Sequence, residues 1–349
     1  MSAQPSFHNA GNLFSVGVDL GGTNLRIAAY AGGTDVLDTI LLPTRLSEGP
    51  ERIVRDICEA VTSLSRRSFG GRNFAGVGIG TPGPLQLPEG ILRNPPNLPG
   101  WDGFNLRSEI EAKLGFIVEI ESDANVAALA EARLGAGRRH SVASLCVLTL
   151  GTGVGSGLIL NQEIWHGATG MGGEAGHIIV QPENGAPCGC GGSGCLEQYA
   201  SATAVVRMAR ERLGPAAPAS AHDIYLMAVA GDQQALSVFE SVGRSLATGL
   251  TALINTLNLP LYLLGGGLCE AWDLFAPTLF HELRSRSYVY RLTEPNDHNP
   301  EILEHHKTYI LPAQLGSTAG LLGACLLPFH GQPALPFVME DSLGAWKLL

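Results

Sequence analysis

Four potential metal ligands lie in one short glycine-rich stretch of the chain: His177, Cys188, Cys190 and Cys195. One imidazole and three thiolates form the ligand set of a tetrahedral zinc site. Glycines between the cysteines allow the three sulfur atoms to converge without steric cost. The alternative is a flexible loop with free thiols, but the remaining cysteines lie apart in apolar segments and lack ligand spacing. We therefore expect a structural Zn2+ ion here.

Three carboxylates are placed where they could act on a substrate. Glu174 and Glu197 flank the metal ligands, and because a purely structural zinc site does not require them, we expect the metal loop to shape a pocket. Asp123 begins a predicted helix directly after a strand, where the helix dipole and free N–H groups stabilise a carboxylate. A simple helix N-cap is the alternative. Asn97 and the Gly/Pro loop at 80–85 favour a general base that faces a substrate hydroxyl.

A Gly/Thr turn at 19–24 (DLGGTN) has the composition of a phosphate-binding loop. Gly21 and Gly22 allow backbone N–H groups to approach a phosphate, and Thr23 offers a hydroxyl. Asp19 stands at the end of a strand, where it could hold Mg2+ through water. An ordinary hairpin turn with a buried Asp is the alternative. The sequence of this turn matches neither the Walker pattern nor the dinucleotide fingerprint.

A second glycine-rich turn begins with Gly151, Thr152 and Gly153, in the equivalent place of the later half of the chain. Two such turns, one from each half, could clamp a polyphosphate. Gly266 and Gly267 belong to a run of three glycines after a buried strand, which suits close approach of the backbone to a flat ligand such as adenine. A plain turn from strand to helix explains that run equally well.

Apolar spacing predicts two α/β halves that position these groups. Each half begins with a strand, a Gly/Thr turn and a second strand, at 14–30 and 144–160. Further strands are expected at 74–81, 116–122, 259–265 and 308–313, and helices at 49–67, 106–115, 122–137, 196–213, 221–230, 232–257, 270–287 and 316–327. Two halves that face each other form a cleft, where we expect the ligands to bind.

The same pattern predicts the domain organisation. We expect a loose N-terminal tail at 1–13 and a smaller α/β domain at 14–125 that the helix near 316–328 completes. A larger α/β domain with the zinc-binding loop follows at 126–330, and 331–349 form a C-terminal tail.

Composition limits the classes of partner. Apolar residues make up 45% of the 349 residues and charged residues 15%, so a sizeable core is expected. The net charge of −10 argues against nucleic acid and anionic membranes as partners. The first dozen residues lack the basic and apolar regions of a signal peptide, and no apolar run reaches membrane-spanning length. Unpaired core cysteines suit a reducing compartment, so we expect a cytoplasmic protein.

The order of the motifs resembles the ROK family (repressors, open reading frames and kinases). DLGGTN, GTPGPL, PNLPGW, SDANVAALAE, LTLGTGVGSG, GMGGEAGH, CGCGGSGCLE and LLGGGL follow one another over roughly 14–330. The resemblance implies an actin-like, ribonuclease H-like ATPase fold with two α/β domains around a central cleft. It also implies an ATP-dependent hexose kinase, similar to the glucokinase branch, that uses Mg2+ with ATP and forms a homodimer or homotetramer.

The resemblance also implies roles for single residues, with Asp123 as the catalytic base. Sugar contacts are implied for Gly83, Asn97, Ser122, Asp123, Glu174, His177 and Glu197. ATP contacts are implied for Asp19, Gly21, Gly22, Thr23, Asn24, Gly151, Thr152, Gly153, Gly266 and Gly267. His177 then binds zinc through one ring nitrogen and a sugar hydroxyl through the other. Family members often have Asn in place of Ser122, so either water fills the gap or a different hydroxyl is recognised.

The expected activity is phosphorylation of the 6-hydroxyl of glucose. A kinase for N-acetylmannosamine or N-acetylglucosamine and a fructokinase are the alternatives within the family. A noncatalytic sugar-responsive regulator is the alternative from another class. Repressors of this family carry an N-terminal winged helix-turn-helix, for which a DLGGTN motif at residue 19 leaves no room, and the acidic net charge agrees.

Overall fold

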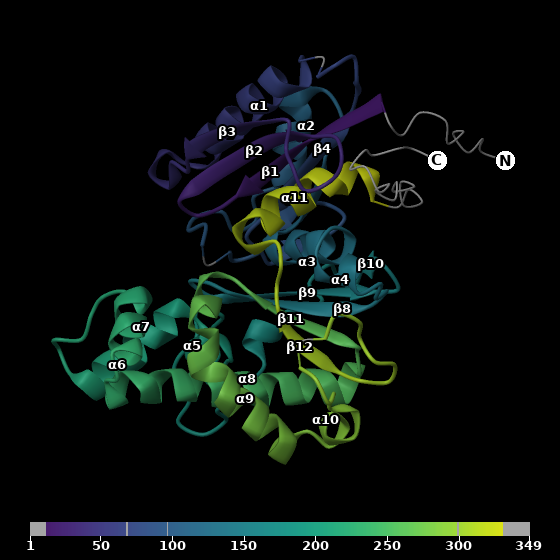
Figure 1. Ribbon diagram of the computed structural model, residues 1–349. Helices are drawn as coiled ribbons and strands as arrows, with labels where there is room; N and C mark the ends of the chain where they lie inside the picture. Colours follow the sequence, from purple (N-terminus) through teal and green to yellow (C-terminus); the bar gives the residue numbers. More distant parts are fainter. Residues whose placement is uncertain (1–11, 68, 96, 299, 331–349) are drawn as a thin grey trace. The chain divides into compact units, whose positions relative to one another are not determined.

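The computed structural model describes residues 12–67, 69–95, 97–298 and 300–330, which fold into two compact units (Figure 1). Unit 1 comprises the described residues up to Ser122 and from Gly320 onwards, and unit 2 is Asp123–Ala319. The chain therefore passes from one unit to the other twice. The predicted boundary at 125/126 falls inside the first helix of unit 2. Of the predicted tails, 1–11 and 331–349 lie outside the described residues, and Leu13 already belongs to a strand.

Unit 1 is built on a five-stranded mixed sheet. Its strand order is β3 (Asp38–Pro43), β2 (Asn24–Tyr30), β1 (Leu13–Leu20), β4 (Asn73–Thr81) and β7 (Glu119–Ser122). The first three strands are antiparallel, and β4 and β7 continue the sheet in parallel from β1. The short strands β5 (Leu85–Gln86) and β6 (Ile91–Leu92) form a separate hairpin.

Both faces of this sheet are covered by helices, as the near-continuous apolar sequence of β1 predicts. Helices α1 (Pro50–Ser65) and α2 (Leu106–Leu114) lie on one face and α11 (Ala319–Leu326) on the other (Figure 1). Side chains of β1 alternate between these faces. Val16 and Val18 join the core below α1, whereas the hydroxyl of Ser15 donates to the carbonyl of Cys325 on α11 at 2.6 Å. Gly17 lies on the α11 face, where a Cβ atom would overlap Cys325.

Unit 2 repeats the same sheet topology. Its strand order is β10 (Glu163–Ile164), β9 (Val154–Leu160), β8 (Leu145–Leu150), β11 (Leu261–Gly265) and β12 (Tyr309–Pro312). The directions also match those of unit 1, with an antiparallel hairpin of β8 and β9 and parallel pairing of β11 with β8 and β12. The expected equivalence of the two Gly/Thr turns is therefore matched by the position of each turn in its sheet.

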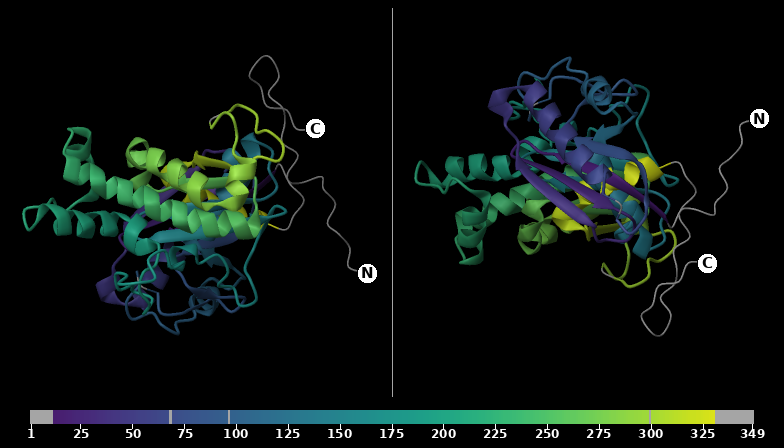
Figure 2. Two further views of the ribbon diagram at one scale, coloured as in Figure 1. Left: turned by 90° about the horizontal axis from the view of Figure 1, so that it is seen from below. Right: turned by 90° about the horizontal axis from the view of Figure 1, so that it is seen from above.

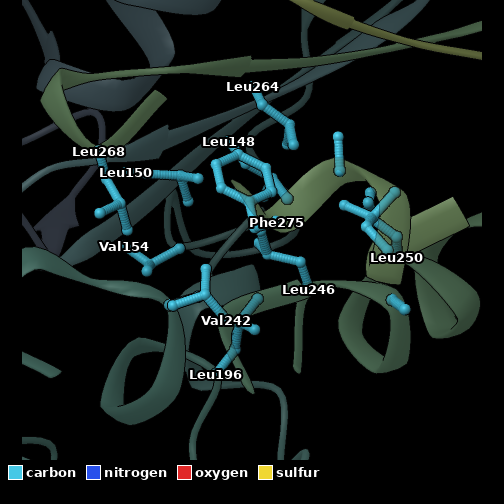
Figure 3. Close-up of a cluster of buried hydrophobic side chains, with 14 of the residues drawn as sticks. Leu148, Leu150, Val154, Leu196, Val242, Leu246, Leu250, Leu264, Leu268 and Phe275 are labelled. Atoms are coloured by element: carbon cyan, nitrogen blue, oxygen red, sulfur yellow. The ribbon is translucent and has the colours of Figure 1, made fainter. Parts of the chain in front are cut away.

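Helices also cover both faces of the second sheet. Helices α3 (Asp123–Arg133) and α4 (Ala136–Arg139) lie on one face, while α8 (Gln233–Leu257) and α9 (Trp272–Arg286) run side by side on the other (Figures 1 and 2). Leu148, Leu150, Val242, Leu246 and Phe275 pack together between the strands and the α8–α9 layer (Figure 3). The remaining helices of unit 2 are α5 (Glu197–Ala200), α6 (Ala202–Leu213), α7 (Ala221–Val229) and α10 (Tyr288–Thr293).

Several predicted elements differ from the observed ones. The predicted helix at 196–213 is wrong as a single helix, because Ser201 is extended (φ −107°, ψ 163°) and its hydroxyl caps α6 by accepting the N–H of Ala204 at 3.1 Å. The strand predicted at 116–122 begins only at Glu119. The short helices α4 and α10 were not predicted. No helix among the described residues has the length and apolar character needed to span a membrane.

Candidate active site

Asp123 is the first residue of α3, directly after β7 and exposed to solvent. Its Oδ1 atom accepts the backbone N–H of Ala124 at 2.7 Å. The start of α3 packs closely on β9, since a Cβ at Gly155 would lie 3.1 Å from that of Ala124, and a Cβ at Gly157 would lie 2.6 Å from the carbonyl oxygen of Ala124. Glycines in β9 thus serve helix packing and place the start of α3 against the strand that follows the glycine-rich turn.

That turn is held by a hydrogen bond within the turn and by two hydrogen bonds from the start of α6. The N–H of Gly151 donates to the carbonyl of Gly153 at 3.0 Å and closes the turn. The N–H of Ala202 donates to the carbonyl of Gly151 at 2.8 Å. The hydroxyl of Thr203 donates to the backbone carbonyl of Thr152, also at 2.8 Å. The turn is therefore a rigid feature that could present its N–H groups to a phosphate.

Glu197 connects the turn to the cysteine-rich loop. Its Oε2 atom accepts the N–H of Val154 at 3.0 Å, and its Oε1 atom lies 3.9 Å from Sγ of Cys188. A Cβ at Gly153 would overlap the carboxylate of Glu197. Glycine at 153 is therefore required by the position of the carboxylate, in addition to any approach of phosphate.

The structure brings the four predicted metal ligands together. The ligand atoms of His177, Cys188, Cys190 and Cys195 all lie within 4.8 Å of one another. Sγ of Cys190 lies 3.7 Å from Sγ of Cys195, and Sγ of Cys188 lies 3.7 Å from Nδ1 of His177. A tetrahedral site with zinc–sulfur bonds of about 2.3 Å has sulfur–sulfur edges of roughly 3.8 Å. The donor set is that of a tetrahedral zinc ion, and the two printed separations are close to this edge length.

The thiols of this cluster differ in their ionisation. Burial raises the pKa of Cys188, and raises that of Cys195 to about 12. The backbone N–H of Gly192 is the main cause of the lowered pKa of Cys190. With raised pKa values, Cys188 and Cys195 would need the charge of a bound cation to be thiolates at neutral pH.

Glu174 and His177 form a polar pair beside the cluster. With Nδ1 of His177 directed to Cys188, its Nε2 atom lies 4.0 Å from Oε2 of Glu174. Although 44% of the Glu174 side chain is exposed, burial of the carboxyl group raises its pKa; His177 opposes this increase and Glu197 adds to it. Two carboxylates and a ring nitrogen are thus available to bind the hydroxyls of a polyol.

A cavity of about 620 Å³ lies next to the Gly/Thr turn, lined by Thr152, Thr203, Val206, Arg207 and Arg210, among others. The residues from α6 were not predicted as site residues. The spacing of Arg207 and Arg210, one helical turn apart in a predicted helix, is the signal that could have indicated them. Arg207 is already oriented by other groups: it donates to the carbonyl of Gln198 at 2.6 Å.

The Gly-Gly-Gly run lies where β11 ends. Gly266 contacts the end of β8, where a Cβ would overlap the carbonyl of Leu150. After Gly267, the 3-10 turn at 267–271 carries Glu270, whose Oε2 lies 3.2 Å from Nδ1 of His222 on α7. Ala221, next to His222, lines the cavity, so this contact links the segment after the glycine run to one wall of the cavity.

The predicted site residues of unit 1 lie near strand ends and in the loops that follow the strands. The hairpin turn is closed by a bond of 3.0 Å from the N–H of Gly21 to the carbonyl of Asn24. Thr23 pairs through its carbonyl with the N–H of Thr44 at 2.8 Å. A Cβ at Gly22 would lie 3.5 Å from the carbonyl oxygen of Asn97. Gly83 lies close to Ser122 in the same way, with 3.8 Å between its Cβ position and the Cβ of Ser122.

Asp19 has a partner that the sequence reasoning did not identify. Nε of Arg26 donates to Oδ2 of Asp19 at 2.9 Å, and the Nη2 group of Arg26 also contacts that oxygen. The two residues are opposite each other in the antiparallel pairing of β1 with β2. The carboxylate is largely buried and close to Gly320 at the start of α11. Any Mg2+ held by Asp19 would therefore share the carboxylate with Arg26.

Comparison with known proteins places these features in a family. The family model described as "ROK family" matches residues 15–330. A glucokinase from Halalkalibacterium halodurans is 34% identical over 321 residues, which are 88% of this chain and 92% of that protein. The xylose repressor of Bacillus subtilis is 29% identical over 320 residues, with 89% of this chain and 75% of the repressor covered.

Solved structures agree with this relationship. A ROK hexokinase from Thermus thermophilus superposes with a TM-score of 0.74 at 32% identity, covering 90% of this chain and 98% of that one. A ROK family glucokinase from Streptomyces griseus, solved in complex with glucose and AMPPNP, has a TM-score of 0.72 at 31% identity and covers 91% and 100% of the two chains. The chain therefore belongs to the ROK family and has the actin-like, ribonuclease H-like ATPase fold of its sugar kinases.

Proposed function

We propose that this chain is a glucokinase: an ATP-dependent sugar kinase that transfers the γ-phosphoryl group of ATP to the 6-hydroxyl of glucose. The observation that carries the proposal is the grouping within unit 2 of an exposed carboxylate at the start of α3, a Gly/Thr turn, and two further carboxylates with an imidazole. The first supplies a base, the second binds phosphate, and the third recognises hydroxyls. The similarity to glucokinases at 31–34% identity supports glucose as the substrate.

Asp123 acts as the general base. Its carboxylate accepts the proton of the 6-hydroxyl as the hydroxyl oxygen attacks the γ-phosphorus of ATP. Positioned proton acceptors of this kind contribute about 10²–10⁴-fold to the rate. The tight packing of Ala124 against Gly155 keeps the start of α3, and with it Asp123, in a fixed place on the sheet.

Glu174, His177 and Glu197 recognise the sugar. Glu197 is oriented by the N–H of Val154, and the ring of His177 is oriented by its Nδ1 contact with Cys188, which leaves Nε2 for a hydroxyl. A site built from such acceptors rejects analogues that leave them unpaired. Gly83, Asn97 and Ser122 of unit 1 remain predicted sugar contacts.

ATP binds through the Gly/Thr turn of unit 2 and the cavity beside α6, and the Gly/Thr turn of unit 1 remains a predicted phosphate contact. A volume of about 620 Å³ is within the range of small-molecule sites and large enough for a nucleoside. Its wall combines aliphatic side chains with Arg207 and Arg210, which suits a base and ribose next to phosphates. Asp19 is the proposed protein group that would hold Mg2+ bound with ATP, and the ion would supply positive charge to the transferring phosphoryl group.

Zinc supports the recognition site. When bound by His177, Cys188, Cys190 and Cys195 it would fix the tautomer of the imidazole and the path of the loop that precedes Glu197. Its role is structural. A homo-oligomer, dimer or tetramer, remains part of the proposal.

A sugar-responsive regulator is the second candidate, favoured by the similarity to xylose repressors. A regulator needs to bind sugar but does not need a general base. Asp123, placed at the helix start, therefore favours the kinase.

The test is a coupled ADP-release assay of the purified full chain with glucose, N-acetylglucosamine, N-acetylmannosamine, fructose and mannose. Glucose is expected to have the highest kcat/KM. If an N-acetylhexosamine has the higher kcat/KM, the glucokinase assignment is overturned and the kinase remains. If glucose binds but no sugar is phosphorylated, the regulator is correct.

A further inference from the structure

Glu131 is a fully buried carboxylate on α3, outside the residues assigned to the site so far. Its Oε1 atom accepts the backbone N–H of Leu315 at 2.7 Å, and its Oε2 atom accepts that of Ala136 at 3.1 Å. Both oxygens of the carboxyl group therefore act as hydrogen-bond acceptors. No salt bridge joins Glu131 to a cation in the described part of the chain. A buried carboxylate without a cation is unfavourable unless strong hydrogen bonds compensate.

The two donors come from segments with different roles. Ala136 is the first residue of the short helix α4, which follows α3 directly. Leu315 is 184 residues away from Glu131 in sequence and immediately precedes the 3-10 turn Gly316–Thr318. Gly135 has no side chain, and a Cβ there would overlap the carboxylate of Glu131. The local sequence therefore leaves room for this arrangement.

The hydrogen bond between Glu131 and Leu315 joins two segments that lie near the boundaries of unit 2. Unit 2 begins at Asp123, the first residue of α3, and ends at Ala319, just after Leu315. Glu131 thus joins, inside unit 2, the two segments by which the chain enters and leaves that unit. A movement of one segment is transmitted to the other through a short charge-assisted bond.

We propose that Glu131 is a positioning residue of the kinase reaction: by fixing α3 to the segment around Leu315, it holds Asp123 at the correct distance from the substrate hydroxyl. This inference rests on the proposed function. Misplacement of a catalytic group by about 1 Å is enough to lower a rate by about 10²-fold. The effect is transmitted through Asp123, because Glu131 itself is buried and touches no substrate.

The first test is Glu131→Gln in the full-length enzyme. The amide has almost the same size, but its NH2 group faces one of the two N–H donors, so one bond is lost. We expect kcat to fall about 10–100-fold, while KM for glucose and for ATP each change less than about 3-fold. The rate is normalised to the folded fraction, measured by circular dichroism at the assay temperature.

A double-mutant cycle separates positioning from general loss of structure. If Glu131 acts through Asp123, the effect of Glu131→Gln should disappear in the Asp123→Asn background, where there is no base to misplace. An equal reduction of kcat in both backgrounds overturns the inference, since it would mean that Glu131 acts independently of Asp123.

Two proline substitutions each remove one of the two N–H donors to Glu131. They provide a second test if Glu131→Gln does not fold. Leu315→Pro removes the N–H that binds Oε1, at a residue whose φ of −85° is near that of proline. The matched control, Ala136→Pro, removes the other donor at the first position of a helix, where proline is well tolerated. Leu315→Pro should lower kcat about 10-fold or more and Ala136→Pro less than about 3-fold.

If the two proline variants lower kcat equally, the inference is overturned, because the bond from Leu315 to Glu131 would then matter no more than the bond from Ala136. A wild-type chain without hexose kinase activity overturns the proposed function, and this inference with it. Normal wild-type activity with unchanged kcat in Glu131→Gln and Leu315→Pro overturns this inference alone.

Discussion

Gly153→Ala gives a sharp test of how Glu197 is held in the sugar site. The new Cβ would overlap the carboxylate of Glu197, which must then leave the N–H of Val154 that it accepts at 3.0 Å. A hydrogen bond to a charged group contributes about 1.5–3 kcal/mol. Since about 1.4 kcal/mol corresponds to a factor of ten, kcat/KM for glucose should fall roughly 10–100-fold. KM for ATP should change less than about 3-fold.

The assay is steady-state ADP release with glucose and ATP varied in turn, repeated in the Glu197→Ala background. In the Glu197→Ala background the three atoms nearest to the new Cβ are removed, so Gly153→Ala should then lower kcat/KM by less than about 3-fold. If Gly153→Ala is just as harmful in the Glu197→Ala background, or acts mainly on KM for ATP, the methyl group disturbs phosphate binding and the reasoning about Glu197 is refuted.

Three further predictions concern the metal, the nucleotide cavity and the sugar. Purified protein should contain about one zinc per chain, and Cys190→Ser should lose it and weaken glucose binding; an active preparation that elemental analysis finds free of metal contradicts this. Chelation should make the thiol of Cys190 available to alkylation, counted by mass spectrometry, because this cysteine is exposed and its pKa is lowered; unchanged labelling would contradict its role as a ligand. Arg210→Ala should raise KM for ATP about 3–10-fold with KM for glucose unchanged, and the reverse pattern would move the nucleotide elsewhere. Ser122→Asn should retain or increase kcat/KM for glucose, and a loss beyond about 10-fold would mean that Ser122 itself recognises a hydroxyl.

The core thiols provide an internal control for the alkylation experiment. Burial raises the pKa of Cys146, Cys269 and Cys325 to about 12 in each case. A raised pKa means that the reactive thiolate is scarce below the pKa, so these three residues should remain unlabelled at pH 8 with or without the chelator. Labelling of all of them on chelation would indicate unfolding instead of metal loss.

The sequence predicted the elements that local patterns determine. Alternating or continuous apolar runs identified β1, β4, β8 and β11, and the Gly/Thr turns identified the hairpins that open each sheet. The break at Ser201 in the predicted helix 196–213 was missed. A serine within a helical apolar pattern can lie inside the helix or cap a new one, and only the structure shows that Ser201 is extended and caps α6.

Residue types and spacing allowed part of the candidate site to be placed. Ligand spacing predicted that the four metal ligands lie together, as they do, and the strand-to-helix pattern placed Asp123 at the start of α3. Contacts that depend on tertiary structure could not be predicted: the pairing of Asp19 with Arg26 requires the strand register, and the bond from Leu315 to Glu131 joins residues far apart in sequence. The second reason for Gly153, room for the Glu197 carboxylate, also appears only in three dimensions.

The most direct measurement of the central claim is glucose-dependent ADP release by Asp123→Asn, together with calorimetric binding of glucose to the same protein. Asparagine retains the size of the side chain and can still accept the N–H of Ala124, but it cannot take the proton of the 6-hydroxyl. We predict that kcat falls about 10²–10⁴-fold or more while the fold remains and glucose still binds within about 3-fold of the wild-type Kd. Turnover near the wild-type rate would contradict the assignment of Asp123 as the base.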